Sequence, residues 1–115
     1  MASERRIERL NALIKEVLGS LIFENVDVGP GELITVVDVL TTEDLLQSDV
    51  LISIMPDKKA EAIFKKLKAS LYDLQHQLNR KLRMRPVPKL VLKLDQTENK
   101  AQKIYELLKK ADEQN

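Results

Sequence analysis

The residues best suited to chemistry are five basic side chains between positions 80 and 89. They are Arg80, Lys81, Arg83, Arg85 and, just past two prolines, Lys89. The planar guanidinium of arginine presents a fork of N–H donors that matches the oxygens of a phosphate group. Bases at the carboxyl end of a helix also complement its dipole, but four within six residues exceed what that role requires. The sequence therefore predicts a phosphate-binding cluster, held by the prolines on a stiff turn.

Two smaller basic groups are candidates for the same nucleic-acid surface. One precedes the cluster and comprises Lys65, Lys66 and Lys68. The other lies near the start of the chain and comprises Arg5, Arg6 and Arg9. Both groups are predicted RNA-binding residues, and the alternative is that they are solvated helix faces, as charge runs commonly are.

Enzyme chemistry has little support in the composition. The chain has no Cys and a single His, His76, which leaves little room for a thiolate metal site or a Ser-His-Asp triad. Four acids could form a magnesium nuclease cluster, namely Asp38, Glu43, Asp44 and Asp49. The sequence supplies no general base or nucleophile to pair with these acids. Aromatic residues make up only 3% of the chain, which argues against a surface on which nucleobases stack. We expect no catalytic residue, no metal site and no cofactor.

The net charge of +1 conceals a strong asymmetry along the chain. Residues 24–57 carry eight acids and no Lys or Arg, whereas residues 65–93 carry nine bases and one acid, Asp73. Such an asymmetry is typical of a domain that binds a polyanion. The acidic segment would repel a nucleic acid, so we expect it to face away from one or toward a basic protein. The plainer alternative is two solvated runs that attract each other across the fold.

Helical periodicity predicts the elements that carry the basic residues. Apolar residues recur every three to four positions from Ile7 onward, which predicts a first helix with Ser3 as its N-cap. A longer periodic segment runs from Asp57, its predicted N-cap, to Arg83, and as one straight helix it would span roughly 40 Å. Because that exceeds the width of a small domain, we predict a break within one turn of Ser70, whose hydroxyl can bond a carbonyl one turn back.

Three short segments predict a small sheet. Residues 33–40 and 49–55 are rich in β-branched side chains and are close enough to pair antiparallel. Residues 89–94 alternate between polar and apolar, and a final helix follows over about 97–112. This order predicts an α+β fold in which helices cover one face of the sheet.

Read in order, these blocks resemble the ribosome-binding factor A family over roughly residues 6–108. The matching positions are Arg6-Ile7, Thr35-Val36, Val39, Asp44-Leu45, Val50-Leu51-Ile52-Ser53, Leu78, Leu82, Met84-Arg85, Val87-Pro88, Leu90, Asp95-x-Thr97, Ile104 and Leu107-Leu108. The run of Arg-x-Val-Pro-x-Leu, a strand, Asp-x-Thr and a capped helix is the most specific part. Three positions depart from the family pattern: Ser70-Leu71-Tyr72 stands for Ala-x-Gly, Asp27-Val28-Gly29 for Asp-Pro-Arg, and Ala101 for Gly.

The resemblance implies a type II K-homology-like fold without the Gly-x-x-Gly loop of ordinary K-homology domains. The glycines agree, since only Gly19, Gly29 and Gly31 are present. It also implies a bacterial, cytoplasmic factor that binds the small ribosomal subunit and its rRNA during late maturation and is linked to growth in the cold. Residues 1–115 are expected to form one monomeric domain with a core over about 4–95.

Two functional hypotheses follow. The first is a non-catalytic assembly factor that binds rRNA through the basic helix end and turn and aids late rRNA processing, with ribosomal proteins as possible partners of the acidic segment 24–57. The second is a protein-interaction module with opposed acidic and basic faces and no direct contact with RNA. No apolar run approaches the ~18 residues of a membrane span, so neither hypothesis involves a membrane.

Overall fold

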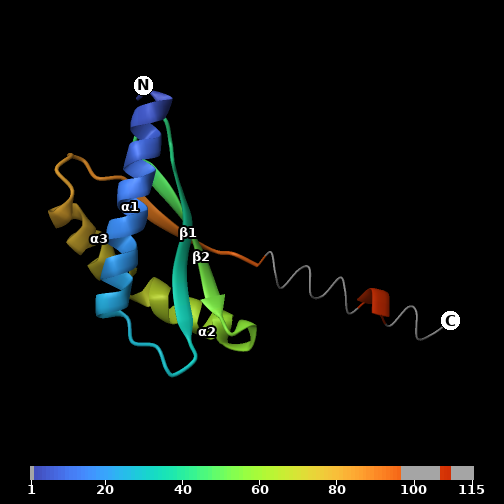
Figure 1. Cartoon of the computed structure of the whole chain (residues 1–115). Coiled ribbons are helices and arrows are strands. Elements are labelled where there is room, and N and C mark those ends of the chain that lie inside the picture. Colours follow the sequence, from blue (N-terminus) through green and yellow to red (C-terminus); the bar gives the residue numbers. More distant parts are fainter. Residues whose placement is uncertain (1, 97–106, 110–115) are drawn as a thin grey trace.

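The computed structural model describes residues 2–96 and 107–109. Along the described chain the elements are α1 (Glu4–Asn25), β1 (Leu33–Thr41), β2 (Gln47–Met55), α2 (Asp57–Ala69), α3 (Leu71–Lys81) and β3 (Lys89–Leu94) (Figure 1). This is the predicted order. The predicted final helix lies outside the described residues, apart from the helical stretch 107–109.

The first helix begins as the sequence indicates. The Ser3 hydroxyl oxygen accepts a hydrogen bond from the backbone N–H of Arg6 at 3.2 Å, which satisfies one of the free donors of the first turn. The buried side of α1 carries Ile14, Leu18, Leu21 and Ile22. These residues recur at helical spacing, so one stripe of α1 faces the core and its other sides face solvent.

The sheet has the order β1-β2-β3, with β1 antiparallel and β3 parallel to the central strand β2. The predicted antiparallel pairing is confirmed. Burial alternates along β2, where Ser48, Val50, Ile52 and Ile54 are buried and their neighbours are more exposed. The buried side packs against the helices, with α1 on β1 and α2 on β2, so helices cover one face of the sheet. Because β3 is parallel to β2, the chain must cross over between them, and α2 and α3 form that crossover.

A β-bulge in β1 corrects a conflict in the sequence. Strict alternation from the buried Val36 would turn the carboxylate of Asp38 into the core. The pairing register shifts between Val36 and Asp38, and Val39 is buried in its place at 1% exposure. The Asp38 carboxylate then accepts the backbone N–H of Val39 at 2.9 Å. The bulge therefore keeps Asp38 at the surface, where its side chain satisfies a donor of the distorted strand.

The predicted break in the long helix is confirmed at Ser70. This residue separates α2 from α3 with φ −89° and ψ 0°, and its backbone N–H donates to Leu67 O at 3.0 Å. Its hydroxyl lies 3.5 Å from Lys66 O, one turn back. The short i to i+3 bond tightens the chain here, which redirects the helix without a glycine.

Two predicted boundaries of these helices are wrong by small amounts. Asp57 is the first helical residue rather than the N-cap, and the capping position belongs to Pro56, with no side-chain bond. The predicted segment reaches about Arg83, but α3 ends at Lys81 because Leu82 is extended, with ψ 143°. Leu82 is buried, so the chain leaves the helix in order to insert this side chain into the core.

Candidate nucleic-acid interface

We call residues 80–89 the basic turn, since it carries the five bases that the sequence singled out. It begins in the last turn of α3, where Leu74 and Leu78 are fully buried and leave Arg80 and Lys81 on the exposed side. Beyond the helix, buried side chains alternate with exposed basic ones. Leu82 and Pro88 are buried, whereas Arg83, Arg85 and Lys89 are exposed. The turn is thus anchored at both ends and presents its charges to solvent.

The side chain of Gln75 fixes the end of the basic turn against α3. Its Nε2 donates to Pro88 O at 3.1 Å, and its Oε1 accepts the backbone N–H of Leu90 at 2.8 Å. Nε2 also donates to Asn79 Oδ1 at 3.0 Å. Sequence reasoning missed Gln75, although a polar residue one turn after Leu71 and next to Leu74, on the apolar side of a predicted helix, is a usable signal.

Arg85 has a structural part in addition to the phosphate contact predicted for it. Its Nη1 donates to Leu82 O at 2.8 Å and to Met84 O at 2.6 Å. The guanidinium therefore closes the turn on which it lies. It still adds positive charge at this surface, but part of its donor fork is already occupied.

The other bases of the turn have no such partners. Among the residues that the structure describes, the one ion pair joins Lys93 and Asp49 at 3.1 Å. Within that part of the chain, Arg80, Lys81 and Arg83 therefore have no carboxylate at ion-pairing distance. Like charges held close together repel each other, and an anion such as a phosphate relieves that repulsion. The geometry suits a surface that binds a polyanion.

The structure brings the amino-terminal arginines to the same end of the molecule. The turn between β1 and β2 links the two groups, since Glu43 O accepts the backbone N–H of Ala2 at 3.3 Å and Leu46 O accepts that of Lys89 at 2.9 Å. Arg5, Arg6 and Arg9 are exposed in the first two turns of α1, the end marked N in Figure 1. The two predicted basic groups therefore share one end of the fold.

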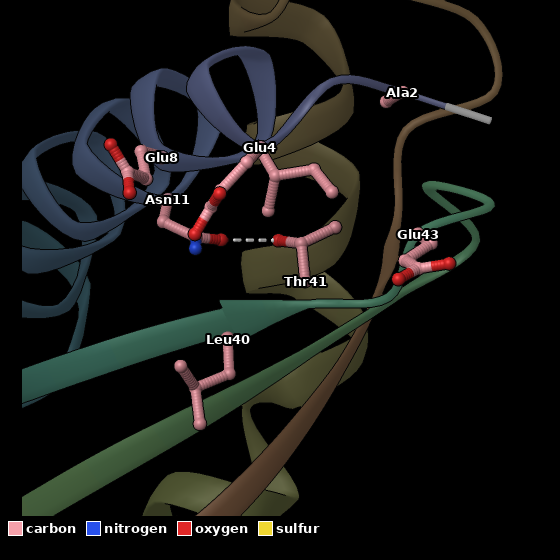
Figure 2. Close-up of a pocket in the computed structure, with 8 residues that line it drawn as sticks. Ala2, Glu4, Glu8, Asn11, Leu40, Thr41 and Glu43 are labelled. Carbon is pink, nitrogen blue, oxygen red and sulfur yellow. Dashed lines mark hydrogen bonds between the residues drawn. The ribbon is translucent and has the colours of Figure 1, made fainter.

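An acidic hollow of about 510 Å³ lies beside these arginines (Figure 2). Glu4, Glu8 and Glu43 line it, so it does not suit a phosphate. At its base the Thr41 hydroxyl donates to Asn11 Oδ1 at 2.6 Å, the bond drawn in Figure 2. Since a hydroxyl has one proton, the buried Ser48 must donate to Thr41 across the 2.7 Å between their oxygens. This network fixes α1 on the sheet.

The third basic group lies at the opposite end. Lys66 Nζ donates to Asp27 O at 2.7 Å, in the loop between α1 and β1, and Lys68 Nζ lies 5.6 Å from the centre of the Phe64 ring. The eleven-residue helix α3, roughly 16 Å long at 1.5 Å per residue, stands between these lysines and the basic turn. Lys65, Lys66 and Lys68 therefore do not share one phosphate site with the basic turn.

The acids considered above for a metal cluster have separate local partners. The Thr42 hydroxyl and the backbone N–H of Leu46 donate to the Asp44 carboxylate at 2.6 and 3.1 Å and lower its pKa. A bond from the Gln47 amide and the ion pair with Lys93 lower the pKa of Asp49. In the described ranges no three or more His, Cys, Asp or Glu side chains gather as a metal site. The same residues include no helix long and apolar enough to cross a membrane.

Comparisons with known proteins give the family context. The family model for Ribosome-binding factor A matches residues 6–108. Ribosome-binding factor A of Prochlorococcus marinus is 31% identical over 113 residues, which cover 96% of this chain and 87% of that protein. The crystal structure of ribosome-binding factor A from Thermus thermophilus aligns with a TM-score of 0.65 and 26% identity, over 76% of this chain and 94% of its own. The predicted K-homology-like fold is thereby confirmed.

A further likeness is to Thermus thermophilus ribosome-binding factor A as fitted into a cryo-electron-microscopy map of a 30S complex. It has a TM-score of 0.59 and 24% identity, over 76% of this chain and 92% of its own. At that identity the likeness bears on the fold alone.

Proposed function

The chain belongs to the ribosome-binding factor A family, and on that premise we propose that it binds the small ribosomal subunit as an assembly factor. The fitting of a family member into a map of a 30S complex supports this partner. We further propose that it acts without catalysis in the cytoplasm and aids late rRNA processing.

The observation that carries the proposal is the unpaired, anchored charge of the basic turn. Arg80, Lys81 and Arg83 are exposed and lack carboxylate partners among the described residues, and Gln75 holds the end of the turn in place. A preformed cationic edge binds phosphates without ordering a flexible segment first, which preserves more of the binding free energy. Phosphate contacts fix the position of a protein on RNA, and they do not select a sequence.

The remaining predicted residues have secondary parts in this proposal. The exposed Arg5, Arg6 and Arg9 lie at the same end as the basic turn and extend its positive field to a second stretch of rRNA backbone. Lys65 and Lys68 are exposed near the end of α2, and an RNA segment that continues from the basic turn along α3 would reach them. Lys66 contributes mainly to the fold through its bond to Asp27 O.

Charge reversal at the basic turn tests the proposal. We expect the triple variant Arg80→Glu, Lys81→Glu, Arg83→Glu to lose co-sedimentation with small subunits while its thermal unfolding stays close to that of the wild type, because exposed charges contribute less than about 1 kcal/mol each. Sequence alone would place Arg85 in this set, but its bonds to Leu82 O and Met84 O would confound binding with folding.

A matched control has the same change in net charge elsewhere. Lys15→Glu, Lys58→Glu and Lys59→Glu alter three exposed lysines outside the predicted groups, and this variant should bind at least half as well as the wild type. Undiminished co-sedimentation of the folded basic-turn variant would contradict the proposed site.

Salt dependence separates RNA binding from the protein-interaction hypothesis. If about four phosphates are neutralised, the affinity for rRNA fragments falls roughly 10²-fold between 50 and 200 mM salt. Binding that does not respond to salt, or that requires no RNA, would favour the interaction module.

A further inference from the structure

A second surface lies where α1 ends and β1 begins, at the end of the sheet opposite Lys89. Three apolar side chains are exposed there: Phe23 at 89%, Leu33 at 56% and Val28 at 41%. They border a groove of about 280 Å³, whose other apolar lining is Ile22, Val26 and Ile34. We call this the Phe23 groove.

The grouping of these exposed apolar side chains indicates a binding site. Single exposed apolar residues are common and need no explanation. Several exposed apolar residues that line one groove are typical of an interaction site. Ligand pockets usually measure about 300–1,000 Å³, so a groove slightly smaller than that range suits one inserted side chain better than a cofactor. The dimensions therefore fit the anchor residue of a protein partner.

The charge around the groove specifies the partner further. Glu24, Asp27 and Glu32 carry acidic groups on the segment that forms it. Lys66 contacts this loop, and its ammonium donates to the backbone oxygen of Asp27. Three acids beside an apolar groove attract Lys and Arg and repel phosphate.

The groove is held in shape by local bonds. The Glu32 carboxylate accepts the backbone N–H of Gly29 at 3.0 Å, and Gly31 supplies the left-handed backbone, φ 78°, that the turn requires. Val26 is buried directly after α1 and anchors the loop from below. A preformed groove loses little conformational entropy when a partner docks.

We propose that the Phe23 groove docks a basic protein of the small ribosomal subunit, which inserts one large apolar side chain flanked by Lys or Arg. This proposal rests on the proposed function: the basic turn holds rRNA at one end while the Phe23 groove holds protein at the other. The acids beside the groove repel phosphate, so the groove itself favours protein over RNA.

The test uses two probes, intact small subunits and the protein-free rRNA extracted from them. Phe23→Ala should weaken binding to intact subunits about tenfold and leave binding to protein-free rRNA unchanged. Glu24→Lys together with Asp27→Lys should also weaken binding to intact subunits, by charge repulsion of the basic partner, while its binding to protein-free rRNA should be at least as tight as that of the wild type. Tyr72→Ala is the matched control, since it removes an aromatic side chain that is 83% exposed on α3, away from the groove, and it should bind both probes as the wild type does.

Each other outcome has a definite meaning. A wild-type protein that binds neither probe would overturn the proposed function itself. If the wild type binds subunits and the Phe23 and charge variants bind equally well, the docking proposal is wrong and the proposed function stands. Equal losses on both probes would mean that the groove contacts RNA. A wild-type dimer in sedimentation velocity that Phe23→Ala converts to a monomer would assign the groove to a second copy of this chain. Because Phe23 is almost fully exposed, the variant's thermal unfolding should match that of the wild type.

Discussion

At the scale of single residues, Gln75 has the most consequential side chain next to the basic turn. Its amide bonds both Pro88 O and the backbone N–H of Leu90, so one residue of α3 satisfies two backbone groups of the incoming strand. A side chain of similar shape without polar atoms would leave both groups without their partner.

Replacement of Gln75 by Met should lower the free energy of unfolding by about 1–3 kcal/mol, the usual cost of part-buried polar groups that lose their partner. The measurement is the urea midpoint. Gln77→Met is the control, because within the described part of the chain the Gln77 amide bonds the exposed Asn25 alone, and it should cost less than about 0.5 kcal/mol. Equal losses in the two variants would show that the bonds to the turn have no special weight.

The β1–β2 turn should make stability depend on pH. The bonds from Thr42 and Leu46 lower the pKa of Asp44 in the folded protein. A carboxyl whose pKa is lower in the folded protein stabilises the fold at pH values above its pKa in the unfolded chain, which is about 4. This contribution is lost as the pH falls through the pKa of the folded protein. Asp44→Ala should therefore lower the urea midpoint at pH 7, and the gap from the wild type should narrow below about pH 4. A gap that stays constant down to about pH 2.5 would contradict this.

At the scale of elements, the break at Ser70 shows how a helix can change direction without glycine. Related sequences are expected to use Ala-x-Gly here, and Tyr72 stands in the glycine position of this chain. In the structure Tyr72 is the second residue of α3, exposed and helical. The short bond from Ser70 N to Leu67 O makes the bend, and no left-handed backbone is needed at Tyr72.

Tyr72→Gly should therefore destabilise the protein. Compared with Tyr72→Ala, we expect a loss of about 0.5–1 kcal/mol, the entropic cost of glycine in a helix. Thermal unfolding of both variants measures it. A glycine variant at least as stable as the alanine variant would indicate that the bend is strained at this residue.

Elements with a strong periodic signal could be predicted from sequence, and those set by tertiary contacts could not. The Ser3 cap, the strands and the break at Ser70 follow from residue type, spacing and length. The bulge in β1 could not, because Val36, Val37 and Val39 are equally apolar and only the pairing with β2 selects the buried ones. The basic turn was likewise visible as a cluster. The inward role of Arg85 depends on carbonyls that converge only after folding.

At the scale of the whole molecule, the predicted RNA-binding residues divide between two ends. The basic turn and the amino-terminal arginines lie at one end, and Lys65, Lys66 and Lys68 lie near the loop between α1 and β1 at the other (Figure 1). The acids are also divided, since Glu43 borders the hollow of Figure 2 and Asp27 borders the Phe23 groove. Neither the basic nor the acidic residues are confined to one end of the molecule.

Lysine acetylation read by mass spectrometry should reveal this division. With protein-free rRNA bound, Lys81 and Lys89 should become at least fivefold less reactive, while the exposed Lys58 and Lys59 should keep their reactivity. Protection of Lys65 and Lys68 to the same degree as Lys81 would show that RNA extends along the whole sheet.

The bulge at Val37 also bears on how this chain behaves at high concentration. β1 is an edge strand, and a regular edge offers free N–H and C=O groups that can template a strand from another molecule, the first step of amyloid-like aggregation. The bulge interrupts that ladder in the middle of β1, and the Asp38 carboxylate occupies one of its donors. On the opposite edge, β3 carries Lys89 and Lys93 at exposed positions, where charge opposes the approach of a like strand. The β-bulge that keeps Asp38 out of the core therefore also disfavours pairing between the edge strands of two molecules.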